Sequence, residues 1–387
     1  MTLAGMLLLT SSLRAQQIKL SFNAVLMDPI ASEGVVYFGT SDGRLYAVNA
    51  TDGSSVSGFP LDVRAAIGDN SYPITRPSVY YGALGKAIYL TTSKGGVVKI
   101  WPNGSIAWTN SFAGSSSYGG TATPAVTPDG TVIVERKTSA NIFIVKLKES
   151  DGTTVMTSPP LSSTYYDWAG SPAVVGDNIY TSVTRPPNNL SIIVLNRSDL
   201  TVKAATMPAP QGWSPAYVRG DGIYYGTASL NSSVVKLNSS TLAPDPRFGP
   251  STHPGRIVLG PSDLGAYTEI SASPTSADQD PGGTIYASVQ SSNIAEVVAI
   301  DAESGSVRGL YYGSYGAGGM VVSSRNIAAY GDGNTMNLFS VTGGGMRSYT
   351  VVGRPQRPTY DASTDRFFAR TIQGTDGISY LMGFDSP

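Results

Sequence analysis

The feature that most constrains this 387-residue chain is a short phrase that recurs eight times along it. Each copy has two or more apolar residues followed by a polar turn. The first and last copies start 336 residues apart over seven steps, so the mean period is 48 residues. A period of this length predicts an array of supersecondary units that stack on one another. The copies start at Leu45, Val97, Ile144, Ile192, Val234, Val297, Leu338 and Leu381.

A second phrase precedes each copy and consists of a small or Pro-led start followed by a β run, as in Ser171–Val183. Each unit is therefore expected to contain four strands joined by tight turns, with Asp in many of the turns. Helical repeats need apolar positions at 3.6-residue spacing, which the chain lacks, and leucine-rich repeats are shorter. The sequence predicts an all-β, eight-bladed β-propeller of four-stranded antiparallel blades. The turn residues are Asp42, Asp52, Asp129, Asp151 and Asp221.

The two ends of the chain are expected to meet in one blade. The last copy stops at Pro387, directly after its third strand, so a fourth strand is missing. Near the other end, Gln17–Phe22 alternates apolar and polar residues as a strand does. We expect this N-terminal strand to complete the eighth blade, because closure removes an open sheet edge. The predicted organisation is one propeller domain over 16–387, preceded by an apolar segment over 1–15.

The apolar run Leu3–Leu9 in this N-terminal segment is too short to span a bilayer. It fits the centre of a signal peptide ending near Ala15, although no Lys or Arg precedes it and Arg14 lies at the cleavage point. A retained docking segment is the second interpretation, and both stay open. Six Asn-x-Ser/Thr sequons also favour export to the cell surface or beyond, as possible glycosylation sites. They are Asn49, Asn103, Asn189, Asn196, Asn231 and Asn238.

Composition narrows the classes of partner and chemistry. Charged residues are 14% of the chain, the net charge is −1, and no Lys/Arg cluster is present. Nucleic acid is therefore not an expected partner. The chain has no cysteine, which excludes disulfides, thiolate metal sites and a Cys nucleophile. Neither a membrane span nor a metal site is expected.

The repeat resembles that of the pyrroloquinoline-quinone (PQQ)-like propellers. Gly34–Gly53, GVVYFGTSDGRLYAVNATDG, follows the family pattern closely, and Val297–Gly305 fits its second half. The family includes quinoprotein alcohol dehydrogenases and the outer-membrane assembly scaffold BamB, so the resemblance implies the propeller fold. The enzymes also carry a vicinal disulfide, a Ca²⁺ cluster and an Asp base, none of which this chain matches. Trp108 is one remnant of the Trp that recurs on their outer strands. We therefore expect no cofactor.

Candidate site residues are few. His253, the only histidine, lies in the longest insertion between blades, Leu242–Glu269, and is interpreted as an exposed loop residue. Asp278 and Asp280 are interpreted as part of a polar hairpin turn. Four aromatic residues before the first strands of two units form a possible binding mouth near the channel, for a sugar or a peptide; packing between blades is equally compatible. These residues are Trp168, Trp213, Tyr165 and Tyr166.

These observations favour a non-enzymatic extracellular protein, either a cell-surface scaffold or a subunit of a surface layer or filament. Its expected partners are other proteins or further copies of itself, and glycans are a further option. Two alternatives remain. One is an enzyme with its site in the channel, either a divergent quinoprotein or a hydrolase or lyase. The other is a glycan-binding propeller.

Overall fold

The structure, a computed structural model, describes most of residues 18–387. It leaves out 1–17 and the stretches 69, 74, 83, 113–121, 139–140, 162–167, 170, 186–188, 206–208, 211–216, 228–232, 253–255, 260–266, 273–282, 291–294, 314–315 and 373–376. The expected N-terminal segment 1–15 thus lies outside the described residues.

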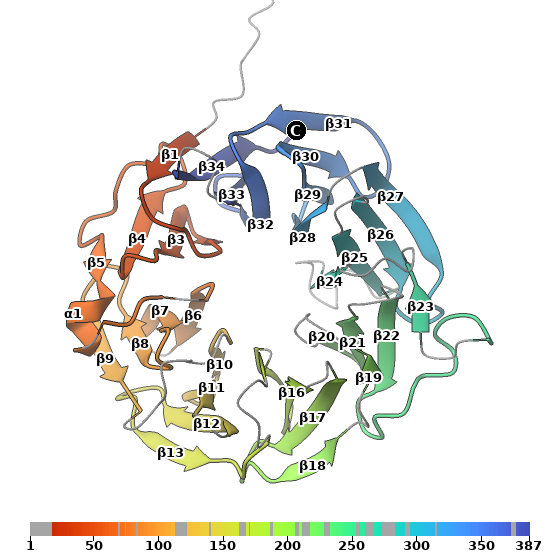
Figure 1. The fold of residues 1–387 in the computed structure, drawn as a ribbon, viewed down its shortest axis with the longest axis horizontal. Coiled ribbons are helices and arrows are strands. Elements are labelled where there is room, and N and C mark those ends of the chain that lie inside the picture. Colours follow the sequence, from red (N-terminus) through yellow and green to blue (C-terminus); the bar gives the residue numbers. More distant parts are fainter. Residues whose placement is uncertain are drawn as a thin grey trace, which may run out of the picture.

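Eight antiparallel sheets stand around a central axis like the blades of a propeller (Figure 1). In each blade the first strand lies nearest the axis and the fourth lies on the rim. The eight-bladed prediction is confirmed. Blade 1 contains β2 (Ile30–Ser32), β3 (Val35–Gly39), β4 (Arg44–Asn49) and β5 (Leu61–Asp62); blade 2 contains β6 (Ser78–Gly82), β7 (Gly85–Thr91), β8 (Val97–Ile100) and β9 (Ile106–Asn110); blade 3 contains β10 (Ala125–Thr127), β11 (Thr131–Lys137), β12 (Ile142–Lys148) and β13 (Thr154–Thr157).

Blade 4 departs from the pattern of four strands, because its inner and outer positions are each shared by two short strands. The strands β14 (Trp168–Ala169) and β15 (Ala173–Val175) both pair with β16 (Asn178–Arg185). On the outer side, β18 (Val202–Ala205) and β19 (Ala209–Pro210) both pair with β17 (Asn189–Asn196).

The remaining blades return to four strands. Blade 5 contains β20 (Tyr217–Arg219), β21 (Gly222–Gly226), β22 (Ser233–Asn238) and β23 (Arg256–Val258); blade 6 contains β24 (Tyr267–Ala272), β25 (Thr284–Gln290), β26 (Ala295–Asp301) and β27 (Val307–Gly313); blade 7 contains β28 (Gly316–Val322), β29 (Ile327–Asp332), β30 (Thr335–Ser340) and β31 (Met346–Thr350); blade 8 contains β32 (Arg354–Asp361), β33 (Arg366–Ile372), β34 (Ser379–Asp385) and β1 (Ile18–Phe22).

The ring is closed by strand β1, as the sequence predicts. It lies antiparallel to β34, with Ile18 opposite Gly383 and Phe22 opposite Ser379. Blade 8 therefore takes three strands from the C-terminus and its outer strand from the N-terminus. This arrangement ties the first described residues to the last ones through a sheet, without a covalent bond.

The hydrophobic core lies between the blades. The described residues form eight buried apolar clusters, and each cluster joins side chains of two neighbouring blades. The second and third strands are buried on both faces, so β21 is buried along its whole length. The rim strands are largely exposed, as β31 illustrates. A blade alone would leave two apolar faces in water, so each blade depends on its neighbours.

The turn between the third and fourth strands recurs with the same hydrogen bonds. A residue in the left-handed conformation donates its N–H to the last residue of the third strand, as Gly53 does to Asn49. Gly152 and Gly305 hold this position in two other blades, where glycine adopts positive φ without strain. Blades 4 and 5 place Leu200 and Leu242 there instead, at φ 57° and 56°, and both side chains are buried.

Helical structure is limited to one short helix among the described residues, α1 (Val63–Ile67). Asp62 caps it by accepting a hydrogen bond from the N–H of Ala65 at 3.0 Å. No helix in the described part of the chain has the length and apolar character needed to cross a bilayer.

Strand β1 offers a direct test of ring closure. Ile18 is buried in the cluster between blades 8 and 1, whereas Ser21 on the same strand is exposed. We expect Ile18→Ala to lower the free energy of unfolding by about 2 to 5 kcal/mol, because it removes buried methyl groups and leaves a cavity. Denaturant unfolding measures this change, with Ser21→Ala as the control. Equal midpoints for the two variants would show that β1 does not close the ring in solution.

Candidate functional site

A buried carboxylate is the centre of a polar cluster where blades 8, 1 and 2 meet. Asp28 precedes β2, and its residue is only 8% exposed. Its Oδ1 accepts a hydrogen bond from Nε of Arg370 at 2.5 Å, and its Oδ2 accepts one from Nη1 of Arg357 at 3.0 Å. Both arginines belong to blade 8, on β33 and β32. The cluster therefore adds ion pairs to the seam that β1 closes.

Arg357 is held in an unusual backbone conformation. The register between β32 and β33 shifts between Gln356 and Thr359, which marks a β-bulge, and Arg357 in this bulge has φ 37°. The guanidinium of Arg76, which precedes β6 in blade 2, donates Nη2 hydrogen bonds to the carbonyl oxygens of Arg357 and Pro358 at 2.9 and 3.3 Å. Left-handed backbone at a residue other than glycine costs free energy, so the surrounding contacts must stabilise it.

The protonation of Asp28 follows from this environment. Burial by itself raises the pKa of the Asp28 carboxyl, but the charges of Arg370, Arg357 and Arg76 outweigh it and lower the pKa to about 2. A group with so low a pKa is a poor proton donor or acceptor near neutral pH. Both of its oxygens also accept hydrogen bonds from arginines. The cluster is therefore suited to holding blades together and not to acid–base catalysis.

No other arrangement of catalytic or metal-binding type is found in the part of the chain that the structure describes. No group of three or more His, Asp or Glu side chains there is placed to hold a metal ion. Many turn carboxylates have local partners instead. Asp52 accepts hydrogen bonds from Ser54, and Asp151 does the same with Thr153, as the backbone role predicted for these residues requires.

Acid should weaken the seam at Asp28. Because its folded pKa of about 2 lies below the ordinary value of 3.8, the ionised carboxyl stabilises the fold above pH 4, and this contribution is lost as the pH falls toward 2. The shift corresponds to about 2 kcal/mol. We expect Asp28→Asn to remove this part of the acid dependence and to destabilise the protein at neutral pH by about 3 kcal/mol, because the largely buried Arg370 and the half-exposed Arg357 lose their anion.

Unfolding midpoints measured from pH 2 to 7 test this expectation. The control is Asp199→Asn, an exposed turn residue whose substitute keeps an oxygen for the N–H of Thr201; we expect a change within about 0.5 kcal/mol. An Asp28→Asn protein with the stability and acid dependence of the original protein would contradict the assigned role.

A second candidate surface is the rim of the propeller. The outer strands of blades 2 to 7 each expose a large apolar side chain to solvent. Several of these residues follow the recurring turn directly and so occupy similar places around the disc. Single exposed apolar residues are common on protein surfaces, so what distinguishes these is their repetition from blade to blade around the rim. The residues are Ile106, Val155, Val202, Val258, Val307 and Met346.

Neighbouring blades are also joined at the rim, where the outer strand of one blade packs against the turn between the third and fourth strands of the next blade. Trp108 of β9 is buried against Gly152 and donates its indole N–H to the carbonyl oxygen of Glu149 at 2.8 Å. A side chain at position 152 would come within 2.4 Å of the Trp108 ring, so the contact requires glycine. The outer-strand role expected for Trp108 is therefore observed. Beneath it, the buried ammonium of Lys99 pairs with the Glu149 carboxylate.

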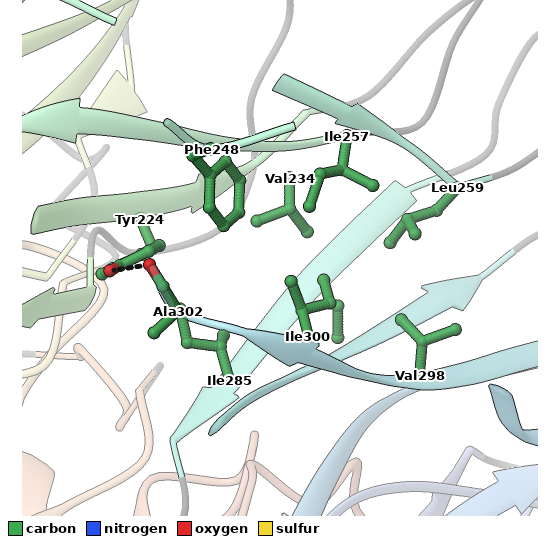
Figure 2. Close-up of a cluster of buried hydrophobic side chains, with 10 residues drawn as sticks. Tyr224, Val234, Phe248, Ile257, Leu259, Ile285, Val298, Ile300 and Ala302 are labelled. Atoms are coloured by element: carbon green, nitrogen blue, oxygen red, sulfur yellow. Dashed lines mark hydrogen bonds between the residues drawn. The ribbon is translucent and has the colours of Figure 1, made fainter. Parts of the chain in front are cut away.

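The seam between blades 5 and 6 has a groove at its rim. The connection from β22 to β23 carries the first part of the predicted insertion, and its Phe248 is fully buried with Tyr224 and Ile257 in the cluster of this seam (Figure 2). The groove of about 550 Å³ lies beside this cluster. Its lining residues are Gly249, Pro250, Arg256, Ile257, Val258, Ser304, Gly305, Ser306 and Val307.

This placement corrects one expectation about the insertion Leu242–Glu269. It was expected to lie between blades, but β23 (Arg256–Val258) lies within it and pairs with β22 as the outer strand of blade 5. The described part of the insertion before β23, residues 242–252, thus belongs to blade 5. The sequence concealed this strand because it has only three residues and follows a Pro-rich stretch.

The predicted sequons that the structure describes are mostly turn residues. Asn103, Asn196 and Asn238 accept hydrogen bonds through Oδ1 from the backbone N–H two residues later. Asn49 ends β4 and donates Nδ2 to Ser54, and Asn189 begins β17. Asn231 lies outside the described residues. A glycan attaches to Nδ2, whereas these three turns use Oδ1, so the turn and the modification are compatible.

Of the predicted aromatic mouth, the structure describes the backbone of Trp168, which belongs to β14 and pairs with β16 on the inner side of blade 4. Tyr165, Tyr166 and Trp213 lie outside the described residues, as do His253, Asp278 and Asp280. The mouth stays a prediction.

Sequence reasoning missed the arginine cluster and the rim surface. A signal for the first was present in the R-P-Q-R-P run of β32, whose two prolines make a regular strand pairing difficult. A signal for the second was the apolar residue that follows the polar turn in several of the repeats, such as Val155 and Val307.

Comparison with known proteins places the chain in context. The family model described as outer membrane protein assembly factor BamB matches residues 15–241. No curated protein matches the chain. Among solved structures, BamB from Moraxella catarrhalis is 16% identical, with a TM-score of 0.56, over 95% of this chain and 98% of that one.

Two other solved structures share the fold. The computationally designed protein Ika8 is 9% identical, with a TM-score of 0.65, over 93% of this chain and 96% of its own. Quinohemoprotein alcohol dehydrogenase from Comamonas testosteroni is 12% identical, with a TM-score of 0.62, over 96% of this chain and 76% of its own. Likeness at such identities concerns the fold alone. The family match covers more than half of the chain and agrees with the eight blades, and the chain therefore belongs to the PQQ-like, BamB-type β-propeller family.

Proposed function

We propose that the chain is a non-enzymatic interaction propeller of the cell exterior that serves as a scaffold or as a subunit of a surface assembly. The observation that carries the proposal is the rim, where six blades in succession expose an apolar side chain on an outer strand whose outward edge pairs with no described strand. The low charge of the chain leaves little electrostatic repulsion between copies. Membership of a family named after an assembly factor supports a protein-binding role.

The chemistry of the described residues favours binding over catalysis. The buried carboxylate of Asp28 is held as an anion by two arginines. The family's quinoproteins provide the enzyme alternative, and the direct test is addition of PQQ and Ca²⁺. We expect an unchanged absorption spectrum and no dye-linked oxidation of alcohols. Tight quinone binding with such activity would overturn the proposal.

Surface assembly makes a physical prediction about the purified chain. We expect its mean particle mass to rise with protein concentration in light scattering, because the apolar rim is removed from water on contact. On cells that make the protein, we expect an impermeant amine reagent to label it. A protein that stays monomeric at high concentration, binds no cell-surface protein and resists labelling would contradict the proposal.

Glycosylation at the rim is part of the same proposal. Asn103 is exposed in the turn between β8 and β9, with Oδ1 accepting from Ser105. The substitution Asn103→Asp removes the sequon but keeps an oxygen for this turn, as Asp151 does in blade 3. We expect the variant made in its natural host to lose the mass of one glycan with an unchanged unfolding midpoint. An identical intact mass, apart from the substitution itself, would show that Asn103 is not modified.

A further inference from the structure

We infer that the rim groove between blades 5 and 6 binds the apolar N-terminal segment of a second copy, with Leu3–Leu9 lying along the outer edge of β27. This inference rests on the proposed self-assembly and names the site and the segment that perform it. Three features support it: the open edge of β27, the groove beside this edge, and the length and position of the N-terminal segment.

Strand β27 offers the longest open edge on the rim among the described outer strands, with seven residues. It pairs with β26 on one side, and no described strand pairs with its other side. Arg308 and Gly309 are exposed, and Tyr312 is 69% exposed. An unpaired edge of this length provides backbone N–H and C=O groups for an added strand.

The groove supplies apolar contacts next to this edge. Val258 at the end of β23 and Val307 at the start of β27 are both exposed and both line it. At this seam Ile257 lies against Gly305, in the place that Trp108 takes against Gly152 between blades 2 and 3. Because isoleucine is much smaller than tryptophan and β23 is short, the groove remains open here. Figure 2 shows Ile257 and Leu259 directed into the cluster between these blades.

The N-terminal segment matches this site in chemistry and length. Its run Leu3–Leu9 has seven apolar or small residues and no charge, which suits a groove lined largely by apolar side chains and glycine. Seven extended residues span about 23 Å, the length of a seven-residue strand such as β27. The run therefore has the length needed to pair with the whole edge.

The place from which the segment leaves the fold favours a second copy. It continues from Ile18, the first residue of β1, which is itself the rim strand of blade 8. The residues between Leu9 and Ile18 reach about 30 Å when extended. This length is enough to extend from one propeller onto a second propeller in contact with it. Within one copy, blade 7 with its own rim strand β31 lies between β1 and β27 (Figure 1). The addition of β1 to β34 shows that this end of the chain already pairs by adding a rim strand.

The absence of cysteine from the chain permits a sharp test. Full-length Leu8→Cys and Val307→Cys proteins are mixed under mild oxidation, and we expect a disulfide-linked heterodimer that forms faster than either homodimer. The matched control replaces Val307→Cys with Val202→Cys, which is equally exposed at the start of the rim strand β18. We expect no such preference for the control.

Association measured by light scattering complements the cross-link. Val307→Glu should weaken self-association by at least about tenfold, as loss of an apolar anchor at an interface does. Val175→Glu, at a similarly exposed valine on the inner strand β15 of blade 4, should leave it unchanged. A Val202→Glu effect equal to that of Val307→Glu would assign assembly to the whole rim and overturn the inference. So would a mature protein whose intact mass lacks the first 15 residues, or a cross-link that forms only within single chains of the double Leu8→Cys, Val307→Cys variant.

The outcomes separate the two proposals. If the unmodified protein assembles but no cross-link joins residues 8 and 307, the inference fails and the proposed function stands. If the protein never assembles, the proposed function fails as well.

Discussion

The packing of sheet against sheet between neighbouring blades is the constraint on which the rest of this structure depends. Each of the eight buried clusters draws its side chains from two blades, so no blade has a core of its own. Burial of both faces of a sheet is complete only when the ring closes. Strand β1 closes the ring and places Ile18 in the cluster between blades 8 and 1.

The seam of closure also carries a buried polar cluster. Asp28, Arg357 and Arg370 are joined by ion pairs across it, and Arg76 supports the bulge from blade 2. The other seams use rim contacts of outer strands on turns, such as Trp108 on Gly152. Residues that bind the blades together thus lie between neighbouring blades. The rim strands of blades 2 to 7, each with an edge that no described strand pairs and with an exposed apolar residue, form the surface that we propose for partners.

Much of the fold could be predicted because the same pattern of strands and turns recurs eight times in the sequence. The period of 48 residues, the turn residues and the alternating strand Gln17–Phe22 were sufficient for the blades and their closure. The short strand β23 was missed, since three residues after a Pro-rich connection carry no periodic signal. Less of the candidate site could be predicted. The structure describes Trp168 but not the other three aromatic residues of the predicted mouth, and the sequence analysis did not predict the cluster at Asp28.

The sequence by itself determined which segments are strands, because local alternation and turn chemistry are properties of neighbouring residues. Apart from the pairing of the two chain ends in blade 8, only the tertiary structure decided which distant residues meet. Asp28 and Arg370 are separated by 342 positions, and only the closing of the ring brings their charges within hydrogen-bonding distance. The groove between β23 and β27 likewise depends on how two blades pack. Contacts of this kind come from the geometry of the whole ring, for which a single sequence carries no local pattern.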